Sequence, residues 1–124
     1  MALVLVVEDE PTLRALIARP LRRGGHETLE APEGRTALEL FKHHRPDVVL
    51  TDILMPEQEG IETITGLLAI DREARIIAMS GSLEFGRLDV LDFARKLGAV
   101  ATLRKPFTSA ELLRCVDEVI GVTP

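Results

Sequence analysis

The sequence has no tryptophan, no tyrosine and one cysteine. A single cysteine cannot form a disulfide within the chain, which favours a reducing compartment, the cytoplasm. We interpret Cys115 as a small buried apolar residue, because apolar residues surround it at helical spacing. No apolar run approaches the roughly 20 residues of a membrane-spanning helix, and no signal-peptide pattern begins the chain. We therefore expect no membrane partner.

Positive charge is also scarce. Fifteen basic residues face twenty acidic ones, which gives a net charge of −5, and no stripe of Lys and Arg is present. This balance argues against direct binding to nucleic acid. At 124 residues, with 46% apolar and 28% charged residues, the chain has the size and composition of one soluble domain. We expect a single domain over residues 1–124, without an effector domain.

Short segments with strand-like patterns alternate with helical patterns along the chain. The strand-like segments are residues 3–7, 27–31, 47–51, 75–79 and 100–104. This alternation predicts right-handed βαβ units and a parallel sheet covered on both faces. The three almost wholly apolar segments suit central strands and the other two suit edges. We predict an α/β, flavodoxin-like doubly wound fold with five helices and strand order 2-1-3-4-5.

Helical periodicity and terminal signals define the segments between the strands. Two of the predicted apolar faces consist of Leu13, Leu16, Ile17 and Leu21, and of Val90, Phe93, Ala94 and Leu97. Gly24-Gly25 and Gly98 are expected to end two helices. Residues 108–111 read Thr-Ser-Ala-Glu, a capping box that predicts the start of the last helix. Pro20 is expected to kink or end the first helix.

Charged or hydroxyl side chains follow four of the predicted strands. They are Glu8, Asp9 and Glu10 after the first strand, Asp52 after the third, Ser80 after the fourth and Lys105 after the fifth. Parallel strands end on one edge of the sheet, and ligands bind there where the strand order reverses. We therefore expect these side chains to converge on one cleft.

The three consecutive carboxylates require a compensating charge. Two carboxylates about 4 Å apart repel by roughly 4 kcal/mol at an effective dielectric of 20. Mg²⁺ held by Glu8, Asp9 and Asp52 would offset this repulsion, with Lys105 as a further cation. Such a site suits phosphoryl transfer. Each residue also has a simpler interpretation: Glu10 caps the helix that begins at Pro11, Ser80 lies in a turn, and Lys105 is a surface charge.

Four motifs together resemble the response regulator receiver domain of two-component systems, over about residues 2–121. They are VLVVEDE, TDILMP (51–56), MSG (79–81) and LRKPF (103–107). The resemblance implies a phosphoacceptor signalling domain that is not an enzyme but takes part in its own phosphorylation and dephosphorylation. It also implies a sensor histidine kinase or histidine phosphotransfer protein as donor, and a downstream protein partner or a homodimer as output.

The resemblance also implies a role for each site residue. Asp52 would accept the phosphoryl group. Asp9 would ligate Mg²⁺ directly and Glu8 through water, and Asp52 and the backbone carbonyl of Leu54 would complete the protein ligands. Ser80 and Lys105 would contact the attached phosphoryl group. The spacing of the residues does not by itself select Asp52 over Asp9 as the nucleophile.

Two features depart from the family pattern. Thr102 occupies the switch position where the family often has tyrosine or phenylalanine, and residues 81–87 form a longer connection than usual. We therefore predict that Phe85, driven through Ser80, changes its packing on phosphorylation. The alternative is that Phe85 packs against the fourth helix in both states.

Other functions remain to be weighed. A receiver-like binding module that signals without phosphorylation is the main alternative. A flavodoxin-type carrier would need a phosphate-binding loop where this chain has carboxylates, and a dehalogenase-type phosphatase would need Asp at Leu54. His43 and His44 suggest a histidine phosphotransfer module, but that class is a helix bundle, and cations at a helix C-terminus suit its dipole.

Overall fold

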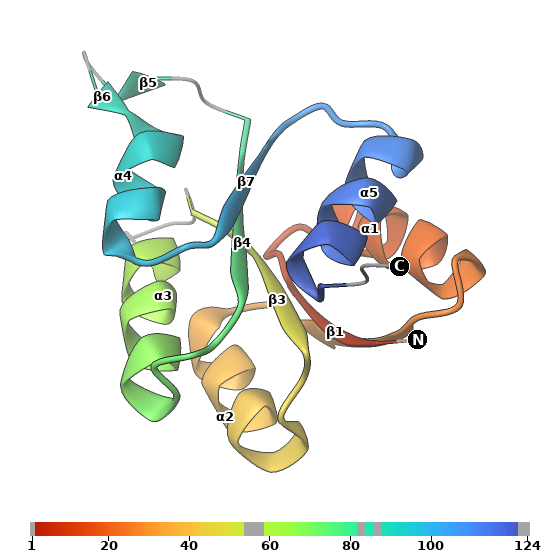
Figure 1. Cartoon of the computed structure of the whole chain (residues 1–124), viewed down its shortest axis with the longest axis horizontal. Coiled ribbons are helices and arrows are strands. Elements are labelled where there is room, and N and C mark those ends of the chain that lie inside the picture. The colour runs from red at the N-terminus through yellow and green to blue at the C-terminus, as the bar shows by residue number, and fades with distance from the viewer. Residues whose placement is uncertain (1, 54–58, 82–83, 86–87, 122–124) are drawn as a thin grey trace.

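A five-stranded parallel sheet is the centre of the computed structural model, which describes residues 2–53, 59–81, 84–85 and 88–121. Its strands are β1 (Leu3–Val7), β2 (Glu27–Ala31), β3 (Val48–Asp52), β4 (Ile76–Ser80) and β7 (Ala101–Arg104). They lie in the order β2-β1-β3-β4-β7, and all four pairings are parallel (Figure 1). The predicted fold class and strand order are confirmed.

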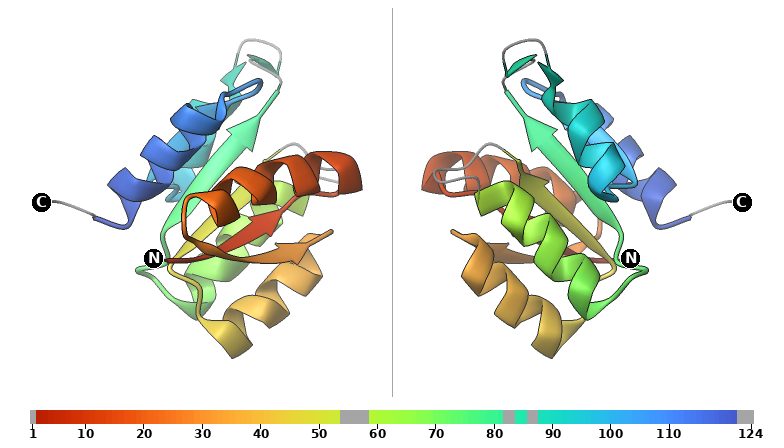
Figure 2. Two further views of the ribbon diagram at one scale, coloured as in Figure 1. Left: turned by 90° about the vertical axis from the view of Figure 1, so that its right-hand side faces the viewer. Right: turned by 90° about the vertical axis from the view of Figure 1, so that its left-hand side faces the viewer.

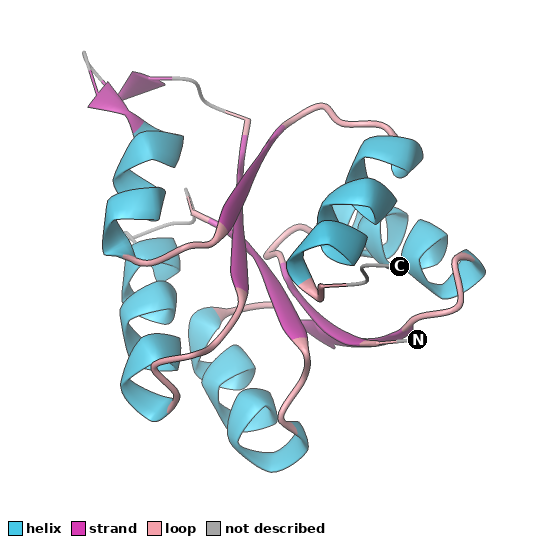
Figure 3. Cartoon of the chain, viewed as in Figure 1, coloured by secondary structure: helices cyan, strands magenta, loops and turns pink. Residues whose placement is uncertain are grey.

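Five helices cover the two faces of this sheet. They are α1 (Pro11–Arg23), α2 (Gly34–His44), α3 (Glu59–Ile70), α4 (Val90–Leu97) and α5 (Ser109–Val119). Helices α1 and α5 lie on one face, and α2, α3 and α4 lie on the other (Figures 2 and 3). This two-sided cover explains why the central strands are apolar at consecutive positions.

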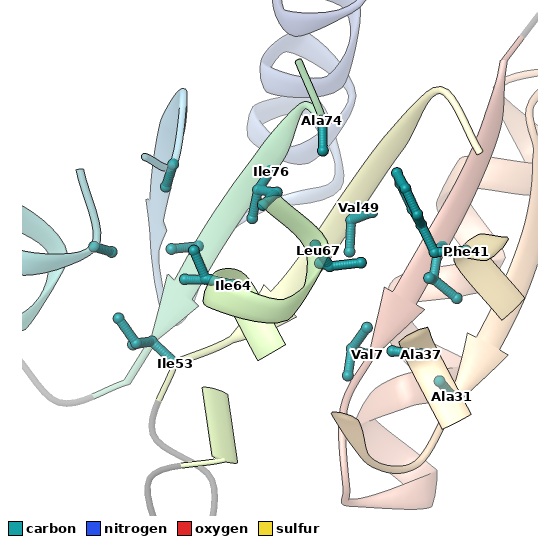
Figure 4. Close-up of a cluster of buried hydrophobic side chains, with 14 residues drawn as sticks. Val7, Ala31, Ala37, Phe41, Val49, Ile53, Ile64, Leu67, Ala74 and Ile76 are labelled. Carbon is teal, nitrogen blue, oxygen red and sulfur yellow. The ribbon is translucent and has the colours of Figure 1, made fainter. Parts of the chain in front are cut away.

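Successive residues of the central strands pack into two separate cores. In β1, Leu5 and Val7 join the core under α2, α3 and α4, which Figure 4 shows together with Ile64 and Leu67 of α3. Val4 and Val6 point to the opposite core, under α1 and α5. Side chains of a strand alternate between the faces, so two buried faces require an unbroken apolar run.

The ends of two strands differ from the sequence prediction by one residue. β3 includes Asp52 and β4 includes Ser80, where we expected both residues to follow their strands. Asp52 pairs with Met79, and Ser80 pairs with Arg104. We placed the strand ends before these polar residues, but the backbone pairing of the sheet includes both of them.

Two apolar residues that we assigned to the buried faces of helices are exposed, so this part of the prediction is wrong. Leu16 is 56% exposed and Phe93 is 42% exposed. In α1 the buried positions are Ile17, Ala18 and Leu21, so the contact with the sheet lies to one side of Leu16. Pro20 does not end the helix, which continues to Arg23 and has Gly24 as its C-cap, as expected for Gly24-Gly25.

The connection from β4 to α4 contains a small antiparallel pair instead of an irregular loop. β5 (Glu84–Phe85) pairs with β6 (Leu88–Asp89), so that Phe85 lies opposite Leu88. The sequence indicated only a longer connection over residues 81–87 and did not predict this pair. Within the described part of the chain, none of the helices is both long and apolar enough to cross a membrane.

The predicted capping box forms at the start of α5. The hydroxyl of Thr108 accepts a hydrogen bond from the Glu111 backbone N–H at 3.0 Å. The Glu111 carboxylate accepts one from the Thr108 N–H, also at 3.0 Å. The bond from the Thr108 backbone lowers the pKa of Glu111. The ionised carboxylate therefore stabilises this end of the helix.

Glu111→Gln should lower the melting temperature at neutral pH, because the ionised carboxylate is the stronger acceptor. Since folding lowers the pKa of Glu111, its stabilising effect is present above the ordinary glutamate pKa. The effect is lost as the pH falls through the lowered value. Calorimetry at several pH values should show the two proteins converging in acid. Glu118→Gln, near the other end of α5, is the matched control and should cause no such loss at neutral pH. A pH-independent difference for Glu111→Gln would contradict the assignment.

Candidate functional site

The Lys105 ammonium lies between two carboxylates at the carboxyl edge of the sheet. Its Nζ donates to Asp52 Oδ2 at 2.6 Å and to Glu8 Oε1 at 2.8 Å. The side chains of Glu8, Asp52 and Lys105 are 2%, 9% and 17% exposed. These are charge-assisted hydrogen bonds in a largely desolvated place, where electrostatic interactions are stronger than in water.

The hydrogen-bond ladder of the sheet positions all three side chains. The Glu8 N–H donates to the Ala31 carbonyl at 3.1 Å, which continues the pairing of β1 with β2. In the same way the Lys105 N–H donates to the Ser80 carbonyl at 2.9 Å, just beyond β7. Asp52 is itself the last residue of β3. The carboxyl edge of one sheet therefore brings the three residues together, as the sequence analysis expected.

The three consecutive carboxylates have separate environments. Glu8 is buried and faces Lys105, whereas Asp9 is exposed. Glu10 is the N-cap of α1 and accepts from the Leu13 N–H at 2.7 Å, with Pro11 following it. The capping interpretation of Glu10 is thus confirmed. Lys105 supplies positive charge to both Glu8 and Asp52, as the sequence analysis expected of this further cation.

Arg14 is a contact of the site that the sequence analysis missed. Its Nη1 donates to the backbone carbonyl of Glu8 at 2.8 Å, and its Nε lies 3.4 Å from Glu30 Oε1 on β2. The guanidinium therefore fixes the peptide that joins the two site acids, Glu8 and Asp9. Its position four residues after the N-cap Glu10, on the same side of the helix, is the signal that could have identified it.

Burial and neighbouring charges shift the pKa of two site residues. Burial raises the pKa of Glu8, and Asp9 and Asp52 add to the rise, while the hydrogen bond from Lys105 partly opposes it. Burial alone would lower the pKa of Lys105, but the hydrogen bonds to Asp52 and Glu8 outweigh it and raise the pKa. Lys105 thus stays charged, and Glu8 is held where ionisation is costly without a cation.

The donor set suits a hard cation in its chemistry. Two carboxylates from neighbouring strands converge on one positive group, and Asp9 lies close enough to raise the pKa of Glu8. Mg²⁺ commonly takes one or two carboxylates and keeps several waters. Among the described residues, no group of three or more His, Cys, Asp or Glu side chains is arranged to hold a metal. Leu54, the expected carbonyl ligand, lies outside the described residues.

Of the expected switch residues, Ser80 contacts the site. Ser80 is fully buried at the end of β4, and its carbonyl accepts the Lys105 N–H. The hydroxyl of Thr102 on β7 accepts a hydrogen bond from Arg95 Nη2 of α4 at 3.3 Å. The side chain of Phe85 lies outside what the structure describes. Thr102 is therefore connected to α4 by a polar contact where the family often has a ring.

Two other candidates lie away from the site. His43 is exposed in the last turn of α2, 3.8 Å from Glu39 one turn earlier. This position agrees with the interpretation of a cation at a helix C-terminus. Cys115 on α5 is half-buried and packs against the core under α1 and α5, and burial raises the pKa of its thiol. It is a packing residue, as predicted.

Comparisons with known proteins agree with the geometry. The response regulator receiver domain family matches residues 4–117. Sporulation initiation phosphotransferase F of Bacillus subtilis is 32% identical over 117 residues, which cover 94% of this chain and 92% of that protein. Transcriptional regulatory protein PdtaR of Mycobacterium tuberculosis is 36% identical over 119 residues, or 95% of this chain and 56% of that protein.

A solved structure adds a parallel for the site. The receiver domain of sensor histidine kinase PA1611 from Pseudomonas aeruginosa is 29% identical to this chain, with a TM-score of 0.85. The match covers 97% of this chain and 98% of that chain, and that structure has a magnesium ion coordinated in its active-site cleft. The likeness in fold therefore extends over nearly the whole of both chains.

Proposed function

Because the chain belongs to the response regulator receiver domain family, we propose that Asp52 accepts a phosphoryl group from a phosphohistidine in a two-component system. The observation that carries this proposal is the 2.6 Å hydrogen bond between Lys105 Nζ and Asp52 Oδ2. A nucleophile whose negative charge is opposed by a fixed cation can approach an anionic phosphoryl group with less repulsion. The same cation can stabilise charge on the phosphoryl oxygens.

The transfer is a single displacement. An Asp52 carboxylate oxygen forms a bond to phosphorus while the phosphorus–nitrogen bond of the phosphohistidine breaks. The electron pair of that bond returns to the imidazole, which takes up a proton from solvent. Lys105 and Ser80 contact the phosphoryl group after transfer. Hydrolysis of the resulting acyl phosphate by water restores the carboxylate, so the domain takes part in its own phosphorylation and dephosphorylation.

We propose Mg²⁺ as the cofactor, held by Asp9 directly, by Glu8 through water, and by Asp52 and the Leu54 carbonyl. When bound, the ion supplies positive charge next to the transferred phosphoryl group. The convergence of the Glu8 and Asp52 carboxylates at one edge of the sheet supports this assignment, because Mg²⁺ binds carboxylate oxygens. Arg14 holds the peptide between Glu8 and Asp9, and so fixes the two acids relative to each other.

The partners follow from the chemistry of the donor. We propose a sensor histidine kinase or a histidine phosphotransfer protein as donor, and a protein partner or a second copy of the chain as the output. The two named relatives, a sporulation phosphotransferase and a transcriptional regulatory protein, support a role in signal transduction. We propose a cytoplasmic location, without direct contact to nucleic acid or membrane.

Asp52→Asn should abolish covalent labelling by a small phosphodonor such as acetyl phosphate in the presence of Mg²⁺. The substitution removes the nucleophilic charge and keeps the shape of the side chain. Intact mass, before and after incubation, measures the added phosphoryl group, and circular dichroism checks the fold. Full labelling of the variant would place the nucleophile elsewhere. A wild-type protein that is folded and never labelled would favour the alternative, a binding module that signals without phosphorylation.

Mg²⁺ should raise the melting temperature, because a ligand of the native state stabilises it by mass action. The increase should be larger in Lys105→Met, since the ammonium no longer neutralises Glu8 and Asp52. It should be smaller in Asp9→Ala, which loses a direct ligand. Calorimetry is suitable because the chain has neither tryptophan nor tyrosine. Equal melting temperatures with and without millimolar Mg²⁺ in the wild type would count against a metal site.

We also propose that Phe85 replaces Thr102 as the group that repacks on phosphorylation. The Thr102 hydroxyl is hydrogen-bonded to Arg95, and Phe85 lies in β5, five residues beyond Ser80 at the end of β4. Aromatic NMR spectra with and without a phosphoryl mimic should show the Phe85 signals moving together with those near Ser80. Phe85 signals that stay fixed while those near Ser80 move would show that Phe85 packs identically in both states.

A further inference from the structure

Gly60, in the first turn of α3, lies directly against the backbone of the phosphoacceptor. The residue is buried. A Cβ atom built on it would lie 2.5 Å from the Asp52 carbonyl oxygen and 2.5 Å from Ile53 Cα, and it would also meet the Ile53 carbonyl oxygen. Cβ atoms in proteins essentially never come within 3.0 Å of such atoms. Only a residue without a side chain fits between the helix and the end of β3.

The backbone that Gly60 contacts has little freedom to move away. The Ile53 N–H donates to the Met79 carbonyl at 2.9 Å, and the Thr51 hydroxyl donates to the Asp52 carbonyl at 3.2 Å. The side chain of Ile53 is completely buried in the core shown in Figure 4. Hydrogen bonds and core packing thus restrain residues 52–53 on the side of the sheet, and Gly60 of α3 lies directly against their backbone on the other side.

We propose that Gly60 is a positioning residue for the phosphoacceptor. Because Gly60 has no side chain, α3 can pack directly against the Asp52 peptide, and this packing keeps the Asp52 carboxylate within hydrogen-bond distance of Lys105. Displacement of that peptide carries the carboxylate with it, away from the ammonium 2.6 Å from Oδ2. Transfer reactions depend steeply on such placement. The proposal rests on the proposed function for its kinetic consequence, but not for its geometry.

Gly66, six residues later in the same helix, provides a matched control. A Cβ atom there would meet only the end of the Leu38 side chain, at 3.0 Å and 3.1 Å from its two Cδ atoms. Leu38 is partly buried on α2 and can change rotamer, whereas the atoms facing Gly60 belong to the backbone. Alanine raises helix propensity at both positions. The two substitutions therefore differ mainly in what the added methyl group touches.

Gly60→Ala should lower the labelling rate at saturating acetyl phosphate and Mg²⁺ by about tenfold or more, whereas Gly66→Ala should change it by less than about twofold. The donor concentration for half-maximal rate should stay nearly constant in both, because placement of the nucleophile acts on the chemical step. Rates are measured by intact mass at a temperature where circular dichroism shows each variant folded. Trimethylamine N-oxide is added if Gly60→Ala needs stabilisation.

NMR separates this proposal from the proposed function. The Asp52 carboxyl and Lys105 ammonium signals should shift in Gly60→Ala and stay in place in Gly66→Ala, whether or not the wild type is labelled. If the wild type is never labelled but these shifts occur, the positioning role stands and the phosphoacceptor function fails. Wild-type rates and unshifted signals in folded Gly60→Ala would overturn the proposal. So would a Gly60→Ala chain that stays unfolded with the osmolyte, because the residue would then serve the fold in general.

Discussion

The contact of one ammonium with two buried carboxylates is the interaction on which the site depends. Glu8 directly follows β1 and Asp52 ends the neighbouring parallel strand β3, so the sheet itself brings two negative charges to a place where little water remains. Lys105 offsets this charge through hydrogen bonds of 2.6 and 2.8 Å. Removal of one member of such a group leaves an uncompensated charge, which is costly in a desolvated place.

The strand order is what makes this contact possible. Lys105 is 53 residues from Asp52 and 97 residues from Glu8 in the sequence. β7 lies beyond β4 at the edge of the sheet, and the long lysine side chain extends back across β4 towards β3 and β1. The Ser80 carbonyl fixes the start of this path by accepting the Lys105 N–H. A different strand order would separate the cation from the acids.

Much of this arrangement could be predicted from the sequence, because the strongest patterns come from burial on two faces. Residues of β1, β3 and β4 pack into both cores, and the resulting apolar runs identify the central strands. Weaker patterns misled us. Asp52 and Ser80 are polar but continue the ladder, whereas Leu16 and Phe93 are apolar but exposed. The residue at which a strand ends, and the burial of a residue at the border of a helix face, depend on tertiary contacts. The local sequence pattern carries no information about those contacts.

The site was predictable as a set of residues but not as a set of contacts. The sequence brings Glu8, Asp9 and Glu10 to one strand end, yet only the turn geometry decides that Glu8 faces Lys105 and Glu10 caps α1. The contact of Arg14 was not predicted, because only the apolar positions of α1 were used to predict its packing. Gly60 escaped notice because the reason for a missing side chain is visible only when the backbone opposite is known.

Most of the buried polar residues gather at one edge of the sheet, and they differ in this from a buried polar residue with a structural role. Within the described part of the chain, the buried polar or charged residues are Glu8, His26, Thr51, Asp52, Thr63 and Ser80. Four of the six lie at the ends of β1, β3 and β4, at one edge of the sheet. His26 has an evident structural role, since its Nδ1 accepts the Ala2 N–H and its Nε2 lies 3.3 Å from Asp117.

A fold selected for stability alone would place apolar side chains at such positions, because buried charges rarely stabilise a protein more than apolar residues of similar volume. Here they gather around a single ammonium, at the edge where this class of fold binds its ligands. The other positions of the central strands β1, β3 and β4 are apolar. Polarity concentrated at this one edge therefore supports a chemical role for the edge.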